Sequence, residues 1–493
     1  MYELKIVTPE SEGIPSASVV KFIDKIAEYG MNIHSFAFIR HGNVAAEVYA
    51  KPFFDENFAH RLYSCSKSFV SLAIGKLLKE GRIRLTDTIS SYFPEYVDEN
   101  TDAKVRETTI EDALKMSVAA RTDSYALRPD LPWAESFFKV DGVKPSGTLF
   151  DYNSSGSFIL GVLVEKLTGK TFIEYLRPEF DAIGVSENVR CVKSPDGYGW
   201  GASGVICTLR DFARVCLLVA DGGLHDGRQL LPSDYLAAAT SRQIANYTQN
   251  DYAPRKSCGY GYQFWITDKG YSMYGMGSQY AFFFPDKDLI FVCNGDTQVS
   301  GDDFCGEFLY EWVSDVYESV SDARLAEGED YNTLCGRISE FSLPASRGKA
   351  YTDFQREIDG VEYALEPNEM GIKKFSLEFT ADGGSFVYEN ARGLKRINFG
   401  ACRYKCGVFP ETEYYSEQVS VPSGREFDCV AIAEWVEDKK LLIRTYVIDD
   451  CLGNLFITLG FKGNEVGVEM RKRAEFFLDD YDGFAYGKRG KND

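Results

Sequence analysis

Histidine is scarce in this chain of 493 residues, and so are long stretches of one chemical character. No uncharged apolar run approaches the ~20 residues that a membrane-spanning helix needs. The chain holds 54 basic and 74 acidic residues, a net charge of −20, and its longest basic run is the segment 471–473. Nucleic acids and anionic membranes are bound by clusters of Lys and Arg. We therefore expect no nucleic-acid partner and no membrane partner.

The N-terminal residues lack the charged start and the apolar core of a secretory signal. We therefore expect a cytoplasmic protein, in which the twelve cysteines are reduced thiols and not a disulfide framework. No His-Glu-x-x-His motif or comparable cluster of metal ligands occurs. The sequence predicts neither a metal nor an organic cofactor.

The chain has only four histidines, which leaves few bases for a Ser-His-Asp hydrolase, and it has no Gly-x-Ser-x-Gly nucleophile elbow. His60, four residues before Ser64, is the one histidine that stays open for that role. Two glycine-containing motifs are interpreted as structural. Residues 199–204 form a turn in this interpretation, because no buried strand precedes them, and residues 168–171 end a helix.

Ser64 and Lys67 form the most informative pattern, Ser-x-x-Lys, at the start of an apolar segment. A serine hydroxyl is a poor nucleophile until a base takes its proton. A lysine three residues later lies one turn away on the same helical face. Burial or neighbouring cations lower the pKa of an ammonium, so that it can act as this base. The pair therefore favours covalent acyl transfer, with the acyl oxyanion of Ser64 near the positive end of a helix dipole.

Residues 1–320 mix helical and strand patterns. Residues 36–40 and 43–49 predict a hairpin that turns at His41-Gly42. Residues 66–79 are apolar on nearly every side, which predicts a buried helix. Further helices are expected over 157–167, 211–220 and 308–320, and adjacent strands over 282–285 and 288–293.

The composition changes after residue 320. Residues 321–345 are mostly polar and are interpreted as a linker. From 346 to 493, short strand patterns follow one another, separated by turns such as Asp382-Gly383-Gly384. This spacing predicts a C-terminal antiparallel β domain, either a barrel or a sandwich.

Three segments occur in an order that is specific even though each is common alone. Ser64-x-x-Lys67 opens one buried helix, Tyr152-Asn153-Ser154 opens a second, and 274–280 leads into a strand. With the stretches 8–14, 81–87, 145–152, 222–232 and 259–265, they resemble the serine β-lactamase and penicillin-recognising family, in its class C, esterase and 6-aminohexanoate-dimer hydrolase branch. The resemblance covers residues 5–318. It implies an α/β (α+β) fold, an antiparallel sheet flanked by helices beside an all-helical lobe.

The resemblance also implies roles for single residues. Ser64 matches the acylated nucleophile, and Lys67 matches the residue that accepts its proton or tunes its partner. Tyr152 matches the tyrosine that passes the proton to the leaving group, and near cationic centres its pKa is expected to fall well below the usual value. The family usually has Asn two residues after this tyrosine. Here Ser154 stands there, after Asn153, and its hydroxyl can still hydrogen-bond to Lys67.

The third motif departs from the family pattern, which is usually Lys-Thr-Gly or His-x-Gly. Met276-Gly277-Ser278 stands there, with a register one residue earlier as the alternative. The N–H of Gln279, or of Ser278 in the other register, would complete the oxyanion hole with Ser64. A thioether cannot bind the carboxylate of a β-lactam or a D-Ala peptide, and losing such a contact costs about 1.5–3 kcal/mol. We therefore expect weak or absent β-lactamase activity.

The sequence thus predicts a serine hydrolase that acts on a small ester, amide or short peptide through a Ser64 acyl-enzyme. Trp133, Trp200 and Trp265 either line an acyl pocket or pack in the core, and the loops 118–140 and 240–258 are expected to shape that pocket. A D-amino-acid peptidase or amidase is one alternative, since such relatives also carry β-barrel domains after the catalytic domain. A non-catalytic binding protein that keeps the fold is another. The sequence does not specify the oligomeric state.

Overall fold

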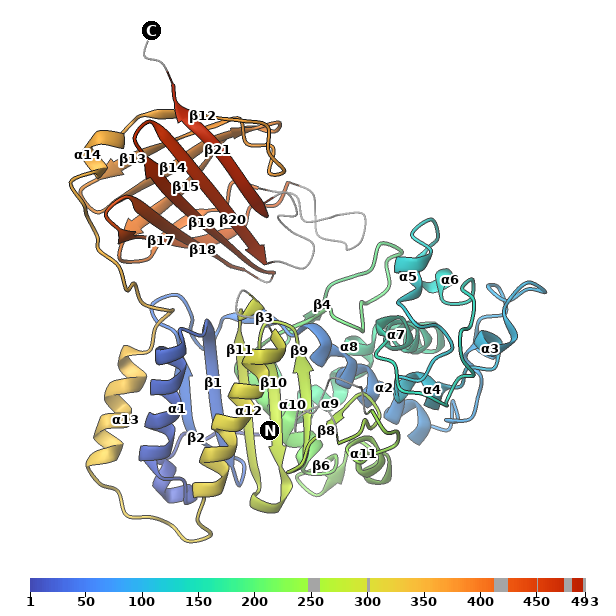
Figure 1. The fold of residues 1–493 in the computed structure, drawn as a ribbon. Coiled ribbons are helices and arrows are strands. Elements are labelled where there is room, and N and C mark those ends of the chain that lie inside the picture. Colours follow the sequence, from blue (N-terminus) through green and yellow to red (C-terminus); the bar gives the residue numbers. More distant parts are fainter. Residues whose placement is uncertain (247–257, 299–301, 412–423, 450, 474–480, 491–493) are drawn as a thin grey trace.

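The computed structural model describes the chain except residues 247–257, 299–301, 412–423, 450, 474–480 and 491–493. A central sheet with helices on both faces lies beside a mainly helical lobe, and a β-barrel stands over one end of the sheet (Figure 1). This is the arrangement that the resemblance implies, an antiparallel sheet flanked by helices beside a helical lobe.

The central sheet is antiparallel and has six strands in the order β2-β1-β11-β10-β9-β8. The predicted hairpin is confirmed, and its turn residues His41 and Gly42 have φ values of 50° and 74°. Two successive positive φ values suit the right-handed twist of the flanking strands. The strands are β1 (Ile33–Arg40), β2 (Asn43–Tyr49), β8 (Trp265–Ile266), β9 (Tyr271–Gly275), β10 (Gln279–Phe284) and β11 (Leu289–Gly295).

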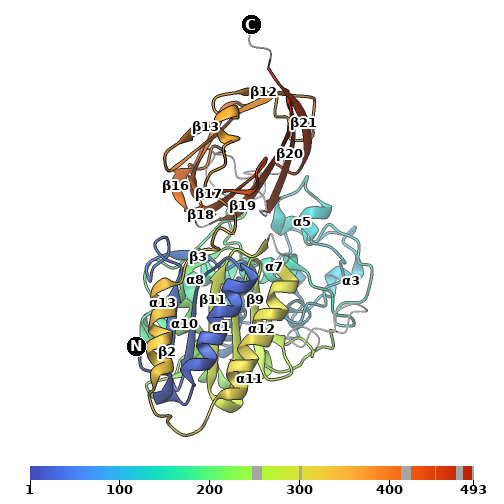
Figure 2. The same cartoon turned by 60° about the vertical axis from the view of Figure 1, so that its left-hand side comes forward.

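Both faces of the sheet are covered, because successive residues of a strand point to opposite sides. In β1, Phe36 and Phe38 pack with α1 (Ser16–Tyr29) and α12 (Asp302–Ser319). Ala37 and Ile39 belong to the core on the other face, which contains α2 (Ser66–Lys79) and α10 (Leu209–Ala220). Figure 2 shows α1, α12 and α13 (Glu329–Glu340) side by side over the first face.

The helical lobe is built on two buried helices that the sequence predicts, α2 (Ser66–Lys79) and α7 (Ser154–Thr168). Gly169 ends α7 with φ 69°, which confirms the interpretation of residues 168–171 as a helix end. The other helices of this domain are α3 (Ala103–Arg106), α4 (Ile110–Leu114), α5 (Ser124–Leu127), α6 (Trp133–Ser136), α8 (Phe172–Tyr175), α9 (Arg177–Ile183), α10 (Leu209–Ala220) and α11 (Ser233–Ala239). Short pairings join β3 (Ala59–Arg61), β5 (Val205–Thr208) and β4 (Arg190–Cys191), and β6 (Leu224–His225) pairs with β7 (Arg228–Gln229).

The segment interpreted as a linker contains a helix, α13 (Glu329–Glu340). Leu334 is 1% exposed and packs with Phe341 in the core beside α1. The few apolar residues of α13 recur at helical spacing within a polar stretch. This is the pattern of a surface helix with a narrow buried face.

The C-terminal domain is a closed barrel and not a sandwich. Neighbouring strands pair in the order β15-β14-β13-β12-β21-β20-β19-β18-β17-β16, and β15 also pairs with β17 in parallel. That pairing closes a ring of nine strands in the described part of the chain and leaves β16 outside it. The strands are β12 (Glu362–Leu365), β13 (Lys374–Thr380), β14 (Gly383–Asn390), β15 (Gly393–Ala401), β16 (Lys405–Val408), β17 (Asp428–Glu437), β18 (Lys440–Ile448), β19 (Leu452–Lys462), β20 (Glu465–Arg473) and β21 (Gly483–Arg489).

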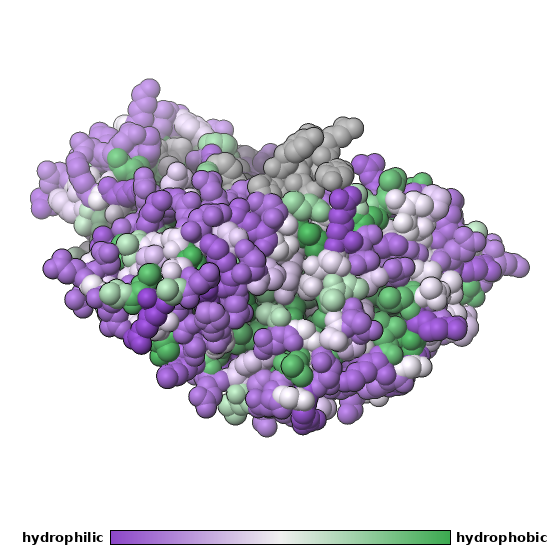
Figure 3. All heavy atoms as spheres, turned by 90° about the horizontal axis from the view of Figure 1, so that it is seen from below, coloured by the Kyte–Doolittle hydropathy of each residue, from purple (hydrophilic) through white to green (hydrophobic). Residues whose placement is uncertain are grey.

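Seen from below the view of Figure 1, hydrophilic side chains cover most of the surface, and hydrophobic ones lie in separate patches (Figure 3). Among the described residues, no helix has the length and apolar character needed to cross a membrane. The cysteines carry free thiols, Cys65 and Cys451 included.

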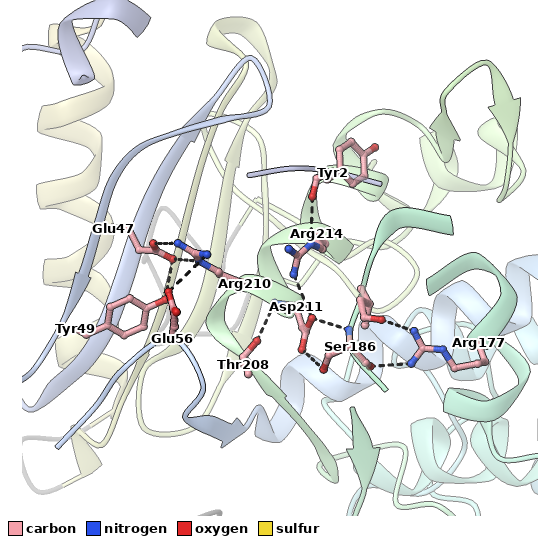
Figure 4. Close-up of polar contacts among 11 residues, drawn as sticks. Tyr2, Glu47, Tyr49, Glu56, Arg177, Ser186, Thr208, Arg210, Asp211 and Arg214 are labelled. Carbon is pink, nitrogen blue, oxygen red and sulfur yellow. Dashed lines mark hydrogen bonds and ion pairs between the residues drawn. The ribbon is translucent and has the colours of Figure 1, made fainter. Parts of the chain in front are cut away.

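Helix α10 is joined to the sheet and to the lobe by partly buried polar contacts (Figure 4). Arg210 donates two hydrogen bonds to Glu47 of β2, at 2.8 and 2.7 Å. The next residue, Asp211, accepts hydrogen bonds from the backbone N–H and the hydroxyl of Ser186, at 2.9 and 2.7 Å. A bidentate arginine–carboxylate pair has a fixed geometry. Helix α10 therefore fixes the position of the lobe relative to the sheet.

Candidate active site

Ser64 lies in a single turn of 3-10 helix, Tyr63–Cys65, between β3 and α2. Tyr63 has a positive φ of 47°, a conformation that costs a non-glycine residue about 1–3 kcal/mol. The guanidinium of Arg61 lies 4.4 Å from the centre of the Tyr63 ring and donates a hydrogen bond to the carbonyl of Ser203 at 2.8 Å. The buried side chains before Ser64 thus hold the turn that carries Ser64 in a strained geometry.

Lys67 is buried, with 2% of its surface exposed, and its ammonium lies beside the serine. Lys67 Nζ donates to Ser64 Oγ at 2.9 Å and to the carbonyl oxygen of Ala202 at 2.7 Å. The helical spacing of the two residues brings them together, as the sequence predicts. The distance allows direct proton transfer between Oγ and Nζ.

Tyr152 completes a three-residue cluster. Lys67 Nζ lies 4.9 Å from the centre of its ring, and the phenol shares a hydrogen bond with the Ser64 hydroxyl. Trp265 stacks against the Tyr152 ring, with centroids 5.4 Å apart. The pKa of Tyr152 is raised, mainly by burial, so the expectation of a lowered pKa is wrong. Loss of water around a phenolate outweighs the hydrogen bond from Ser64 that favours it.

The segment after Tyr152 begins α7. Asn153 is the N-cap, and its side-chain oxygen accepts from the N–H of Gly156 at 3.1 Å. Asp123 accepts from the N–H groups of Ser154 and Ser155, at 2.5 and 3.1 Å. These contacts satisfy N–H groups that a helix N-terminus leaves unpaired. They also place Ser154 on the wall of the cavity that contains Ser64.

The third motif forms the turn between β9 and β10. Met276 lines the cavity with Ser64. Gly277 and Ser278 have φ values of 77° and 73°. Ser278 and Gln279 are fully buried behind the cavity wall. The Gln279 amide donates to the carbonyl oxygens of Gly277 and Gly295, at 3.1 and 2.7 Å. The choice between the N–H groups of Ser278 and Gln279 as oxyanion donors stays a prediction.

The cavity has a volume of about 620 Å³, which is within the range of small-molecule sites. Asp123 is the acidic residue on its wall, and Lys67 is the only basic one among the described residues. Trp133 and Trp200 line it and also belong to the hydrophobic core, so both alternatives left open by the sequence hold for them, whereas Trp265 contacts Tyr152. The lining residues are Tyr63, Ser64, Lys67, Asp123, Tyr125, Ala126, Pro129, Trp133, Ser154, Trp200, Ala202, Ser203 and Met276.

Two parts of the site have no motif in the sequence. The segment 199–204 was interpreted as a simple turn, yet its Ala202 carbonyl is a partner of Lys67. Asp123 comes from a loop that the sequence marks only as one that shapes the pocket. A backbone carbonyl leaves no residue-type signal, so only the tertiary contact shows it.

His60, which the sequence left open as a base, has another environment. His34 Nδ1 and His60 Nε2 lie 3.0 Å apart, and both rings are buried near Phe54. Burial lowers the pKa of His60 to about 3. The ring is outside the set of residues that line the cavity. Lys67 is therefore the basic side chain at hydrogen-bond distance from Ser64.

The chain is similar in sequence to known proteins. The model of the Beta-lactamase family matches residues 19–309, more than half of the chain. The 6-aminohexanoate-dimer hydrolase of Paenarthrobacter ureafaciens is 26% identical over 221 residues, which are 41% of this chain and 55% of that protein. The chain thus spans about half the length of this curated relative.

Two solved structures have a similar fold. A putative 6-aminohexanoate-dimer hydrolase from Bacillus anthracis is 20% identical, with a TM-score of 0.51 over 60% of this chain and 81% of that one. EstCE1, a hydrolase with promiscuous acyltransferase activity, is 14% identical, with a TM-score of 0.50 over 62% of this chain and 99% of that one. With the family model matched across the sheet, the lobe and all three motifs, the chain belongs to the β-lactamase family.

Proposed function

We propose that this protein is a serine hydrolase that cleaves a small ester or amide through an acyl-enzyme on Ser64. The observation that supports it best is the contact of 2.9 Å between Lys67 Nζ and Ser64 Oγ, at the wall of a cavity. The curated relative named 6-aminohexanoate-dimer hydrolase supports hydrolysis as the reaction class.

In the first half of the proposed reaction, the Lys67 ammonium first gives a proton to solvent, and the resulting amine takes the proton of Ser64 as Oγ bonds to the substrate carbonyl carbon. The oxyanion is stabilised by N–H groups of the Ser64 turn and the Met276–Gln279 turn. Tyr152 is protonated in the resting site, because burial raises its pKa. It therefore donates its proton to the leaving oxygen or nitrogen as the C–O or C–N bond of the substrate breaks, and it regains a proton from Lys67.

In the second half, water attacks the acyl carbon and the C–Oγ bond breaks. The phenol and amine pair takes the proton of the water and returns one to Ser64 Oγ, so the enzyme ends in its starting state. The carboxylic acid and the alcohol or amine are the products. No proton donor other than Lys67 and Tyr152 is required.

The cavity wall also supports weak or absent β-lactamase activity. Met276 stands on the wall where related enzymes present a cation, and Lys67 is already bonded to Ser64 and to Ala202. A substrate carboxylate would find no second basic side chain among the described lining residues. An uncharged ester or amide has no carboxylate that needs such a partner, so its binding is not weakened by the lack of a second basic side chain.

The direct test is covalent labelling of the purified protein with a fluorophosphonate, followed by mass spectrometry. We expect one adduct, on Ser64, and none in Ser64→Ala. The control is Ser68→Ala, because Ser68 lies one turn further on α2 and only donates to the Gln263 carbonyl, at 2.7 Å. No adduct on folded wild-type protein, or an adduct on another serine, would refute the proposal.

Turnover then assigns the substrate class. We expect hydrolysis of short p-nitrophenyl esters or anilides and at least 100-fold lower kcat/KM for a chromogenic cephalosporin, which is about 2.7 kcal/mol of transition-state stabilisation. D-Ala p-nitroanilide separates a D-amino-acid amidase from an esterase. Efficient cephalosporin turnover would contradict the role given to Met276.

A further inference from the structure

The barrel contacts the nucleophile turn directly. The backbone N–H of Leu452, the first residue of β19, donates to the hydroxyl oxygen of Tyr63 at 3.1 Å. Tyr63 and Leu452 are each 1% exposed, although 389 positions separate them in the chain. Tyr63 is the strained residue just before Ser64. A residue of the C-terminal domain thus holds the side chain whose backbone positions the nucleophile.

The same leucine packs against the third motif. A Cβ atom placed on Gly277 would lie 2.6 Å from Leu452 Cδ1, so the side chain rests on the glycine itself. Gly277 also has φ 77°, which favours glycine. Leu452 therefore bridges the two turns whose N–H groups face the reacting carbonyl in the proposed reaction.

A second contact between the domains lies two residues further along β19. The amide of Asn454 donates to a carboxylate oxygen of Asp296 at 2.5 Å, and Gln298 donates to the other oxygen at 2.8 Å. Asn454 is fully buried, and Asp296 is 2% exposed. A buried carboxylate needs such donors, because an ion without them costs several kcal/mol.

Asp296 is linked to the third motif through its neighbour in sequence. It follows β11, and the hydroxyl of the next residue, Thr297, lies 2.6 Å from the hydroxyl of Ser278. Figure 1 shows β18 and β19 at the bottom of the barrel, above the ends of β9 and β11. The start of β19 thus touches both sides of the site, one through Tyr63 and the other through Gly277 and Asp296.

We propose that the start of β19 is part of the active-site framework and sets the separation between the Ser64 turn and the Met276–Gln279 turn. Leu452 and Asn454 are positioning residues in this proposal, which rests on the proposed acyl-enzyme chemistry for its activity readout. A displacement of 1 Å between reacting groups lowers a rate about 100-fold. Barrel contacts that hold two turns together therefore act on kcat more than on KM.

The test uses the full-length chain and exchanges the partners of one hydrogen bond. Asn454→Asp puts a second carboxylate against Asp296, and the double variant Asp296→Asn/Asn454→Asp restores an amide facing a carboxylate. In the double variant, the amide oxygen introduced at position 296 can still accept from Gln298. We expect the rate of Ser64 labelling and kcat to fall at least tenfold in Asn454→Asp, with KM changed less than threefold, and to recover in the double variant.

The matched control is Ser385→Ala. It removes a partly buried side-chain hydrogen bond of the same domain, to Asn398 at 2.8 Å, between β14 and β15. We expect this variant to label Ser64 at the wild-type rate. Asn454→Ala provides a second variant if the paired carboxylates prevent folding. Wild-type labelling rates in folded Asn454→Asp and Asn454→Ala would overturn the proposal.

Hydrogen exchange separates this proposal from the proposed function. If the wild-type protein takes no label, the acyl-enzyme proposal fails, yet the framework proposal still predicts faster amide exchange at 62–68 and 275–279 in Asn454→Asp and not in Ser385→Ala. Unchanged exchange in both segments would overturn it independently of activity.

Discussion

Replacing Lys67 by methionine should lower the rate of acylation without lowering the free energy of unfolding. Burial of the ammonium serves the proposed reaction, but it reduces the stability of the fold. Its side chain is 2% exposed, and Nζ contacts Ser64 Oγ and the Ala202 carbonyl. Removing the base from hydrogen-bond distance of the nucleophile should slow acylation about 10²–10⁴-fold.

The stability effect follows from two opposing contributions. Leaving the Ala202 carbonyl unpaired costs about 1–3 kcal/mol. Removing the buried ammonium recovers a desolvation cost of several kcal/mol, and methionine keeps most of the volume. The two nearly cancel, so the free energy of unfolding of Lys67→Met should lie within about 1 kcal/mol of the wild type or above it.

The assay pairs single-turnover acylation with urea unfolding, and Lys76→Met is the matched control. Lys76 lies on the same helix, and its Nζ is 2.6 Å from Glu179, each side chain being 13% exposed. Breaking a buried pair costs about 3–5 kcal/mol, and partial exposure reduces this to about 2–3 kcal/mol. The control should therefore be less stable and acylate normally.

Two results would refute this reasoning. One is a Lys67→Met enzyme that acylates at the wild-type rate, which would remove Lys67 from proton transfer. The other is a loss of stability as large as that of Lys76→Met, which would show that the Lys67 ammonium stabilises the fold and that its burial is not a cost.

Three further outcomes are expected. Tyr152→Phe keeps the stacked ring but loses the proton donor, so kcat should fall about 10²-fold or more for substrates with poor leaving groups and less for activated esters, as steady-state kinetics would show. Arg210→Met leaves Glu47, whose side chain is 7% exposed, without its bidentate partner, and urea unfolding should show a loss of about 2 kcal/mol after allowance for the partial exposure of Arg210. Burial lowers the pKa of His60 to about 3 and that of His34 well below 6.5. Both stay neutral in the fold while the unfolded chain takes protons below pH 6.5, so stability should fall by up to about 1.4 kcal/mol per pH unit per histidine as the pH drops from 6.5 towards 3. The variant His34→Phe/His60→Leu should flatten that slope, and an unchanged slope would contradict it.

The sequence was informative where local rules determine the structure. Ser64 and Lys67 lie close together because three residues make about one helical turn. The hairpin at His41-Gly42 follows from its turn residues, and α2 follows from its apolar pattern. These are short-range relations that a chain carries without any tertiary contact.

The extent to which water is excluded around a side chain could not be inferred in the same way. The sequence placed cations near Tyr152 and implied a lowered pKa, whereas burial raises it. The difference depends on how much water the folded site excludes, which is a property of all the surrounding side chains. The burial of Leu334, in the segment interpreted as a polar linker, could not be inferred for the same reason. It depends on packing against a neighbouring helix.

By itself, the sequence determined the family, the closeness of Ser64 and Lys67, and the presence of a β-rich C-terminal domain, and it predicts the nucleophile pair and the lack of a cation at Met276. Only the tertiary structure decided between barrel and sandwich, brought the Ala202 carbonyl to Lys67 and paired His60 with His34. It also joined Leu452 to Tyr63 across 389 positions. Contacts between backbone groups and between distant segments leave no pattern in neighbouring residues, because they depend on closure of the whole chain.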